Sequence, residues 1–311
     1  MTLDQNTTLP PFERPLSIHN NLYGDDILSM KLYLPELTAK CQRLRETMKG
    51  QNYSELRLPI FVLSSNKLEG TLSPDYSEGE TFKVILNSLK QSSELNDDNQ
   101  IHHIPWNEEG QNGSPFAWYS QCIAHVKAVQ MMAELAHQGK PLDTETVLRC
   151  HNIMMNGAVA ASGESFESRF RGWDEPVSAG KYVFPNKTNH EQDLAEKLEQ
   201  INSTFETKHP VEWACDLLHA IVSLHPFLNG NGRLAHICFA YGMMRHGVPC
   251  AVVFSDWHSK ARRHYIRGLQ EAQGQKSSAG KHEKLHSMAV AGLFATLKNM
   301  VTFCESGSSS Y

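Results

Sequence analysis

The sequence predicts an all-α fold that carries one small β-hairpin. Apolar residues recur at helical spacing along most of the chain, and the two most hydrophobic segments, residues 211–224 and 234–244, have the pattern of buried helices. Residues 170–185 break this pattern, with an alternation and a glycine that are typical of a short hairpin. The 311 residues, 40% hydrophobic and 20% charged, fit one large globular domain or two small ones.

The N-terminal third predicts fewer helices than the rest of the chain. Residues 25–48 have helical spacing, although Pro35 can divide them into two short helices. Residues 57–72 predict a short helix that begins at a serine and ends at a glycine. Residues 91–113 are rich in Asn, Asp, Gln and Gly, which predicts a loop.

The remaining helices are predicted from amphipathic repeats and from capping residues, such as Asp143 or Thr144 before residues 145–156. Their predicted ranges are 118–138, 143–156, 193–207, 211–224, 234–244, 259–273 and 283–304. A basic cluster at the start of one of them, Lys260, Arg262 and Arg263, has the pattern of a solvated helix face.

Charge and cysteine content favour a cytoplasmic protein without nucleic acid or membrane partners. A net charge of -5 gives no basic field for nonspecific binding to nucleic acid. The seven cysteines are scattered without a Cys-x-x-Cys pair, which favours reduced thiols over a disulfide framework or zinc ribbon. No stretch approaches the roughly 20 apolar residues of a membrane span, and the N-terminus has no signal-type apolar segment.

The most informative segment is the loop between the two most hydrophobic helices, which runs from His225 to Arg233 and reads HPFLNGNGR. Gly230 and Gly232 allow backbone N–H groups to converge, and a helix that begins near Asn231 directs its positive end to the same place. The planar guanidinium of Arg233 suits phosphate oxygens. His225 can accept a proton at neutral pH. The segment therefore predicts an anion site beside a general base.

This loop resembles the signature of the Fic family, His-Pro-Phe-x-(Asp/Glu)-Gly-Asn-(Gly/Lys)-Arg, and matches every specified position but one. The resemblance implies a Fic-type helical bundle in which the hairpin at residues 170–185 is a flap over the active site. It also implies a protein adenylyltransferase that moves AMP from ATP to a Ser, Thr or Tyr hydroxyl of a target protein. Arg171 matches a basic residue that often begins the flap.

The resemblance also assigns roles to single residues. His225 would be the general base, and Pro226 and Phe227 would fix the loop. Tyr265 would lie near the adenine, although a packed core tyrosine is an equal alternative. The phosphates would contact residues at the start of the following helix, with Arg233 at the β/γ end: Gly230, Asn231, Gly232 and Arg233.

Two positions depart from the family pattern. Asn229 stands where the family usually has an acidic residue that holds Mg²⁺. Its neutral carbonyl oxygen is a poorer ligand, but phosphates and water supply most of the shell of the ion, so weaker binding of Mg²⁺ or Mn²⁺ is expected rather than none. The other departure is His236, where many relatives carry a second arginine.

A second match lies upstream, where residues 65–70 fit the inhibitory motif of the family, (Ser/Thr)-x-x-x-Glu-(Gly/Asn), with Ser65, Glu69 and Gly70 at the specified positions. Ser65 and Glu69 are four residues apart and share one helix face. If that helix packs beside the nucleotide site, Glu69 can pair with Arg233 and block a productive γ-phosphate position. In relatives of this type the same glutamate can orient a water molecule, so removal of AMP is an alternative activity.

Another function class stays open. Asn229 favours a nucleotide-binding regulatory module with little catalysis, whereas His225 argues against it, because binding alone needs no base. The predicted partner is a protein with an exposed hydroxyl side chain that docks on the flap by β-augmentation. Self-modification and a homodimer are further alternatives.

The motifs divide the chain into four predicted parts. These are an N-terminal helical extension (1–55), a segment with the inhibitory helix and the polar loop (56–113), the Fic catalytic core (114–304) and a disordered tail (305–311).

Overall fold

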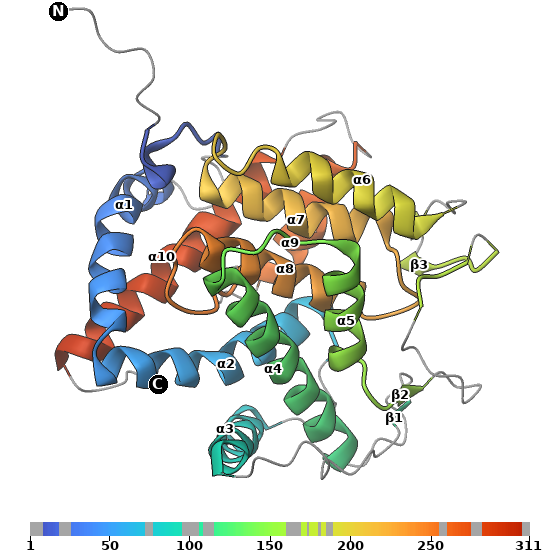
Figure 1. Cartoon of the computed structure of the whole chain (residues 1–311), viewed down its shortest axis with the longest axis horizontal. Helices are drawn as coiled ribbons and strands as arrows, with labels where there is room; N and C mark the ends of the chain where they lie inside the picture. The colour runs from blue at the N-terminus through green and yellow to red at the C-terminus, as the bar shows by residue number, and fades with distance from the viewer. Residues whose placement is uncertain are drawn as a thin grey trace, which may run out of the picture.

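The computed structural model describes residues 9–18, 26–71, 77–94, 106–107, 115–159, 169–172, 174–179, 182–184, 189–254, 260–274 and 282–306. Within these ranges the fold is all-α, with ten α-helices and two ladders of two residues per strand (Figure 1). The helices are α1 (Asp26–Arg45), α2 (Met48–Glu69), α3 (Glu78–Glu94), α4 (Pro115–His137), α5 (Thr144–Met154), α6 (His190–Asn202), α7 (Pro210–Leu224), α8 (Asn231–Arg245), α9 (Ala261–Ala272) and α10 (Glu283–Ser306), preceded by a 3-10 turn at Pro11–Glu13.

The centre of the molecule is the antiparallel pair α7 and α8, as the two most hydrophobic segments predict. Nearly every residue of α8 is buried, and α4 and α7 pack against it. At Gly242 the two helices approach so closely that an added Cβ would lie 2.9 Å from the Cβ of Ala214. The loop between α7 and α8 therefore emerges from the most tightly packed part of the fold.

The N-terminal helices differ from the prediction. Pro35 does not divide the first helix, because α1 continues through it and buries Leu34, Thr38 and Cys41 along a face that packs on α10. The predicted short helix at residues 57–72 is the second half of α2, which begins at Met48 after the cap Thr47. The predicted end is confirmed, since Gly70 caps α2 in the left-handed conformation with φ 73°. The predicted boundary at residue 55 falls inside this helix.

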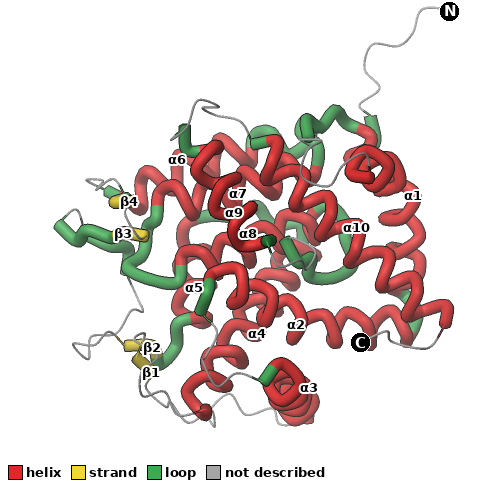
Figure 2. Tube along the Cα trace, turned by 180° about the vertical axis from the view of Figure 1, so that it is seen from behind, coloured by secondary structure: helices red, strands yellow, loops and turns green. Residues whose placement is uncertain are grey.

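Helix α3 is absent from the prediction. It covers residues 78–94, so the first four residues of the predicted loop 91–113 are helical, and of the rest only residues 106–107 are described. The four-residue spacing of Ile85 and Leu89 places both apolar side chains on the face of this helix that packs against α4. Helix α3 lies at the edge of the bundle (Figure 2).

The two short ladders lie on one side of the molecule (Figure 1). Strand β1 (Trp106–Asn107) pairs in parallel with β2 (Ala158–Val159). Strand β3 (Ser178–Ala179) pairs antiparallel with β4 (Tyr182–Val183), within the range predicted for the hairpin. Residues 173, 180, 181 and 185 of that range lie outside the described residues, and a role as a flap stays a prediction.

Helix α10 has the length and composition of a membrane-spanning helix, with a mean hydropathy of 1.3 over its most apolar window. However, 67% of that window is buried inside the fold, where α10 packs on α1, α2, α7 and α9. This is the environment of a core helix. The helix extends to Ser306, two residues into the predicted tail, and residues 307–311 lie outside the described part of the chain.

Candidate functional site

The loop between α7 and α8 has a constrained backbone at both ends. His225 caps α7 with φ 48°, and it is the one non-glycine residue with positive φ in the part of the chain that the structure describes. Gly230 caps α8 with φ 76°, and an added Cβ there would lie 2.7 Å from the Sδ of Met155. A side chain at residue 230 is therefore disfavoured by both backbone conformation and space.

The side chain of Asn231 closes this loop from inside. Its Oδ1 accepts the N–H of Phe227 at 3.0 Å, and its Nδ2 donates to the carbonyl of the same residue at 2.7 Å. Asn231 is 2% exposed, so these bonds are shielded from water. Its amide is thus used to hold the loop, and the group that it can offer to a phosphate is its backbone N–H in the first turn of α8.

His151 of α5 holds the other side of the loop, a role that the sequence analysis missed. Its ring stacks on Phe227 with centroids 3.9 Å apart and an interplanar angle of 8°, and its Nε2–H donates to the carbonyl of Asn229 at 2.9 Å. Phe170 also stacks on Phe227 at 5.0 Å. Phe227 is fully buried, as expected for a residue that anchors the loop. No local sequence signal marks His151, since it is one of 16 histidines and lies far from the loop along the chain.

His225 is held by the segment that contains the predicted hairpin. Arg171 donates from Nε to the carbonyl of His225 at 2.7 Å, and its backbone N–H donates to the carbonyl of Pro226 at 2.9 Å. Phe184 stacks on the His225 imidazole with centroids 3.6 Å apart. Burial lowers the pKa of His225 to about 4. A hydrogen bond to the backbone of Val222 acts in the opposite direction but is the smaller effect. The ring is therefore neutral at pH 7 and can accept a proton.

The N-terminus of α8 faces a carboxylate. A Cβ added to Gly232 would overlap the carboxylate of Glu69, so this glycine leaves the space that the carboxylate occupies. The first N–H groups of a helix carry the positive end of its dipole and attract an anion. Glu69, the last residue of α2, thus lies at the anion-attracting end of α8.

Several groups act on the pKa of Glu69. Burial raises that pKa to about 7, while the charge of Arg233, the hydroxyl of Tyr265 and the charge of Arg262 lower it. The carboxylate of Glu69 also approaches His236, where Oε1 lies 3.5 Å from Nε2. Arg233 is buried and donates from Nη2 to the Sδ of Met155 at 3.5 Å.

The predicted motif at residues 65–70 lies beside α8 as a unit. Ser65 is buried, and its Oγ lies 3.0 Å from Nδ1 of His236. The end of α2 is held from α9, where Arg262 donates to the carbonyls of Leu68 at 3.0 Å and Glu69 at 3.3 Å. The prediction that Arg262 belongs to a solvated face was incomplete, because its guanidinium caps the last carbonyls of α2.

Tyr265 of α9 is buried beside this carboxylate. Burial and the charge of Glu69 raise its pKa well above the ordinary value, and its ring lies 5.2 Å from that of His236. Of the two alternatives for this tyrosine, the packed environment is what the structure describes. An adenine contact stays a prediction.

Asn229 uses its side-chain oxygen within the loop, where Oδ1 accepts the N–H of Gly230. An amide oxygen has a second lone pair, so the residue could still offer one neutral ligand to a cation held mainly by phosphates. Among the described residues, no group of three or more His, Cys, Asp or Glu side chains is placed to hold a metal ion.

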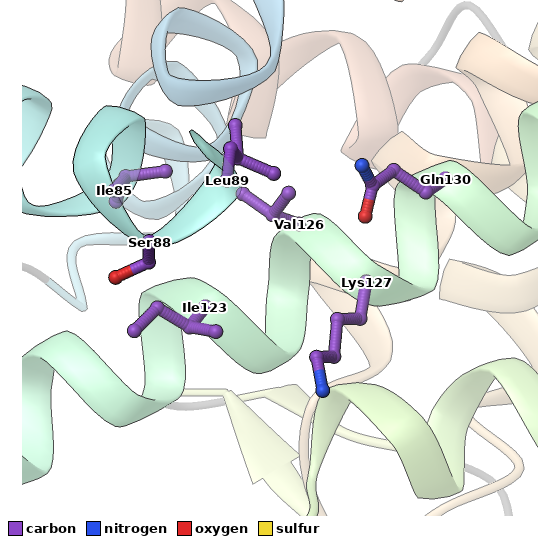
Figure 3. A pocket seen from close by; sticks show the side chains of 7 residues that line it. All are labelled: Ile85, Ser88, Leu89, Ile123, Val126, Lys127 and Gln130. Atoms are coloured by element: carbon purple, nitrogen blue, oxygen red, sulfur yellow. The ribbon is translucent and has the colours of Figure 1, made fainter. Parts of the chain in front are cut away.

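A cavity between α3 and α4 is unrelated to this loop. It is lined by side chains of both helices, among them Ile85, Leu89 and Val126, and has a volume of about 20 Å³ (Figure 3). That is the room of roughly one water molecule. It is therefore too small for a nucleotide.

Comparisons with known proteins converge on one family. The Fic/DOC family model matches residues 141–242, which contain α5 to α7, the loop and most of α8. The chain is 35% identical over 102 residues to a Fido domain-containing protein of Dictyostelium discoideum, covering 32% of this chain and 68% of that protein. It is 30% identical over 102 residues to the Protein adenylyltransferase Fic of Nematostella vectensis, covering 29% of this chain but only 24% of that relative.

Solved structures agree on the fold. A Fic domain containing signaling protein from Bacteroides thetaiotaomicron superposes with a TM-score of 0.66 at 16% identity, covering 89% of this chain and 98% of that chain. Fic-1 from C. elegans superposes with a TM-score of 0.60 at 18% identity, covering 91% of this chain and 74% of that chain. At these identities the likeness concerns the fold.

Proposed function

Because this chain belongs to the Fic/DOC family, we propose that it is a protein adenylyltransferase that transfers AMP from ATP to a Ser, Thr or Tyr hydroxyl of a target protein. The observation that carries the proposal is the loop between α7 and α8. It holds a neutral imidazole at its first residue and an anion-attracting helix N-terminus at its other end. Two sets of contacts, from Asn231 and from His151, fix its shape. Such preorganisation is what a phosphoryl-type transfer needs from a protein.

In the proposed reaction, the triphosphate lies on the first turn of α8. Backbone N–H groups of Gly232 and Arg233 face its oxygens, and the Arg233 guanidinium binds the β/γ end. His225 takes the proton of the attacking hydroxyl while that oxygen bonds to the α-phosphorus. The bond from this phosphorus to the bridging oxygen breaks, and pyrophosphate leaves. Magnesium or manganese, held by the phosphates and by Asn229, would supply charge neutralisation.

We further propose that Glu69 inhibits this reaction by occupying the N-terminus of α8, where the triphosphate is proposed to lie. Its carboxylate lies over Gly232, at the helix end that would receive phosphate oxygens. Both Arg233 and the helix dipole attract it, so a phosphate at this position must displace a carboxylate that is already bound. ATP could then bind only in a displaced position, with its α-phosphate out of line for attack.

The target is proposed to dock along the β3–β4 ladder. The ladder lies between Arg171 and Phe184 in the sequence, and these two residues hold His225. An extended target strand that paired with an edge here would bring its hydroxyl toward the imidazole. Self-modification, a homodimer, a cytoplasmic location and the absence of nucleic acid and membrane partners stay predictions.

The transferase is tested by the intact mass of the Glu69→Gly protein after incubation with ATP and either Mg²⁺ or Mn²⁺, with and without added acceptor protein. We expect the added mass of one adenylyl group on the protein or on the acceptor, and much less with the wild-type chain. Glu305→Gly is the matched control, since it removes an exposed glutamate near the end of α10 that pairs with Lys40. Absence of any adduct from Glu69→Gly under both metals would refute the transferase.

One observation favours a second function. The Asn229 oxygen is already bonded to Gly230 within the loop, which is compatible with nucleotide binding and little catalysis. Calorimetric binding of ATP by the Glu69→Gly protein without an adduct is the result expected for a regulatory module. A hydrolase that removes AMP would instead release it from a modified target and lose that activity in Glu69→Gly.

The inhibition by Glu69 is expected to weaken as the pH rises. In place, Glu69 has a pKa of about 7, whereas an exposed glutamate titrates near 4.3. Between these two pKa values the inhibited state holds a proton that the released state has lost. The free-energy preference for the inhibited state is therefore full at low pH and declines as the pH rises through 7. The charged and titratable groups that face Glu69 are Arg233 and His236 of α8 and Arg262 and Tyr265 of α9.

The measurement is the ratio of wild-type to Glu69→Gly transfer rates between pH 5 and pH 8, in which effects common to both proteins cancel. We expect this ratio to rise roughly 10- to 100-fold over that interval. A ratio that is flat or falls with pH would contradict the assignment of this titration to Glu69.

A further inference from the structure

Both ring nitrogens of His236 face the motif at residues 65–70. Nδ1 lies 3.0 Å from the hydroxyl of Ser65, and Nε2 lies 3.5 Å from Oε1 of Glu69. The two partners are four residues apart on α2, so they are one helical turn apart on the face that meets α8. A single imidazole thus spans the turn of α2 that leads to the inhibitory carboxylate.

The ring is well placed to bridge them. His236 is 1% exposed, and neither its Nε2 nor Oε1 of Glu69 has a hydrogen-bond partner within the described residues, so the two atoms are left to each other. A neutral imidazole has one donor nitrogen and one acceptor nitrogen. It can therefore accept from the Ser65 hydroxyl and donate to the Glu69 carboxylate at the same time.

The orientation of the ring is fixed by its neighbours. Phe254 lies nearly parallel to it with centroids 6.0 Å apart, and Tyr265 contacts it at 5.2 Å. Burial lowers the pKa of His236 to about 3, so the ring carries a single proton at neutral pH. The contact with Glu69 is then an approach of a neutral ring N–H to a carboxylate oxygen rather than a pair of full charges.

We propose that His236 is the positioning residue that holds Glu69 over the N-terminus of α8, with Ser65 fixing the ring from its other nitrogen. This inference rests on the proposed function, because it names the device that keeps Glu69 in its inhibitory position. It also gives Ser65 a role, as the residue that sets which nitrogen of His236 faces the carboxylate. Arg233 then attracts Glu69 by charge, whereas His236 fixes where the carboxylate lies.

The contact itself is tested without any transferase assay. In protein labelled with ¹⁵N-histidine at pH 8, Ser65→Ala is expected to shift the Nδ1 resonance of His236 and Glu69→Gln to shift Nε2. If neither ring resonance of His236 responds to either substitution, the proposal is overturned whether or not the protein is a transferase.

The consequence is tested by nucleotide transfer in four proteins: wild type, His236→Phe, Glu69→Gly and the double variant. Phenylalanine keeps the ring but removes both nitrogens, so we expect transfer to rise about tenfold or more in the otherwise wild-type chain. In the Glu69→Gly background the same change should leave the rate within about twofold, because no carboxylate remains to be held. His246→Phe, at the far end of α8 where the ring stacks on Phe205, is the matched control with no expected gain.

These outcomes separate the two proposals. A merely structural role for His236 would lower transfer in both backgrounds and would overturn the inference while the transferase stands. Absence of transfer in every protein, with the expected ¹⁵N shifts present, would refute the transferase and leave the contact. His236→Gln keeps a polar side chain at this place, so its inhibition is expected to be stronger than that of His236→Phe. Thermal unfolding of each variant checks that the fold is retained.

Discussion

Replacement of His225 in the Glu69→Gly protein is expected to reduce nucleotide transfer by about 10²- to 10⁴-fold while ATP still binds. The imidazole is neutral at pH 7, because burial lowers its pKa to about 4, and it is the group proposed to accept the proton of the attacking hydroxyl. Its ring is fixed by the stack on Phe184, and its carbonyl by Arg171. A base held in this way loses its whole contribution when the ring is removed.

The choice of substitution matters at this residue, because His225 has φ 48°. Alanine carries a conformational penalty of roughly 1–2 kcal/mol in the left-handed region, whereas asparagine adopts it more readily. We therefore pair His225→Ala with His225→Asn, which keeps the turn but offers no proton acceptor at neutral pH. Rates from labelled ATP and affinities from calorimetry are the measurements. Transfer within tenfold of the parent in both variants would exclude His225 as the base.

The local parts of the fold follow from sequence. Asp143 before α5 and Gly70 after α2 act on backbone groups within a few residues, so their caps are confirmed where the pattern predicts them. Helices α7 and α8 are hydrophobic enough to be buried whatever surrounds them. By contrast, α2 begins well before its predicted start and continues through Pro59, because packing on α4, α8, α9 and α10 outweighs the lost backbone bond.

The candidate site divides in the same way. The loop and the motif at residues 65–70 are contiguous in sequence, and their resemblance to a family could be read directly. The residues that hold them are distant along the chain: His151 and Phe184 contact the loop, and Arg262 caps α2. Nothing local distinguishes these side chains from packing residues, so their roles appear only when α5, α9 and the ladder segment are assembled around α8.

Replacement of Asn231 by alanine is expected to lower the free energy of unfolding by about 2–4 kcal/mol, in the absence of any nucleotide. The substitution leaves two backbone groups of Phe227, one N–H and one carbonyl, buried without their partners. Each such group costs roughly 1–3 kcal/mol, and Phe227 is fully buried, so water cannot replace the amide. Chemical denaturation measures the change. Asn156→Ala, in the exposed turn after α5, is the control and should change stability by no more than about 0.5 kcal/mol.

The same substitution separates two roles for Asn231. If its amide closes the loop, stability and transfer fall together, because Phe227 and the start of α8 lose their fixed spacing. Asn231→Asp keeps the acceptor for the Phe227 N–H and loses the donor to its carbonyl, so it should recover about half of the stability. If the amide instead binds phosphate, Asn231→Ala would weaken ATP binding and leave the unfolding free energy unchanged. The bidentate contact with Phe227 makes the first result the expected one, since a side chain that already bonds both backbone groups of a buried residue has little left to offer an oxyanion.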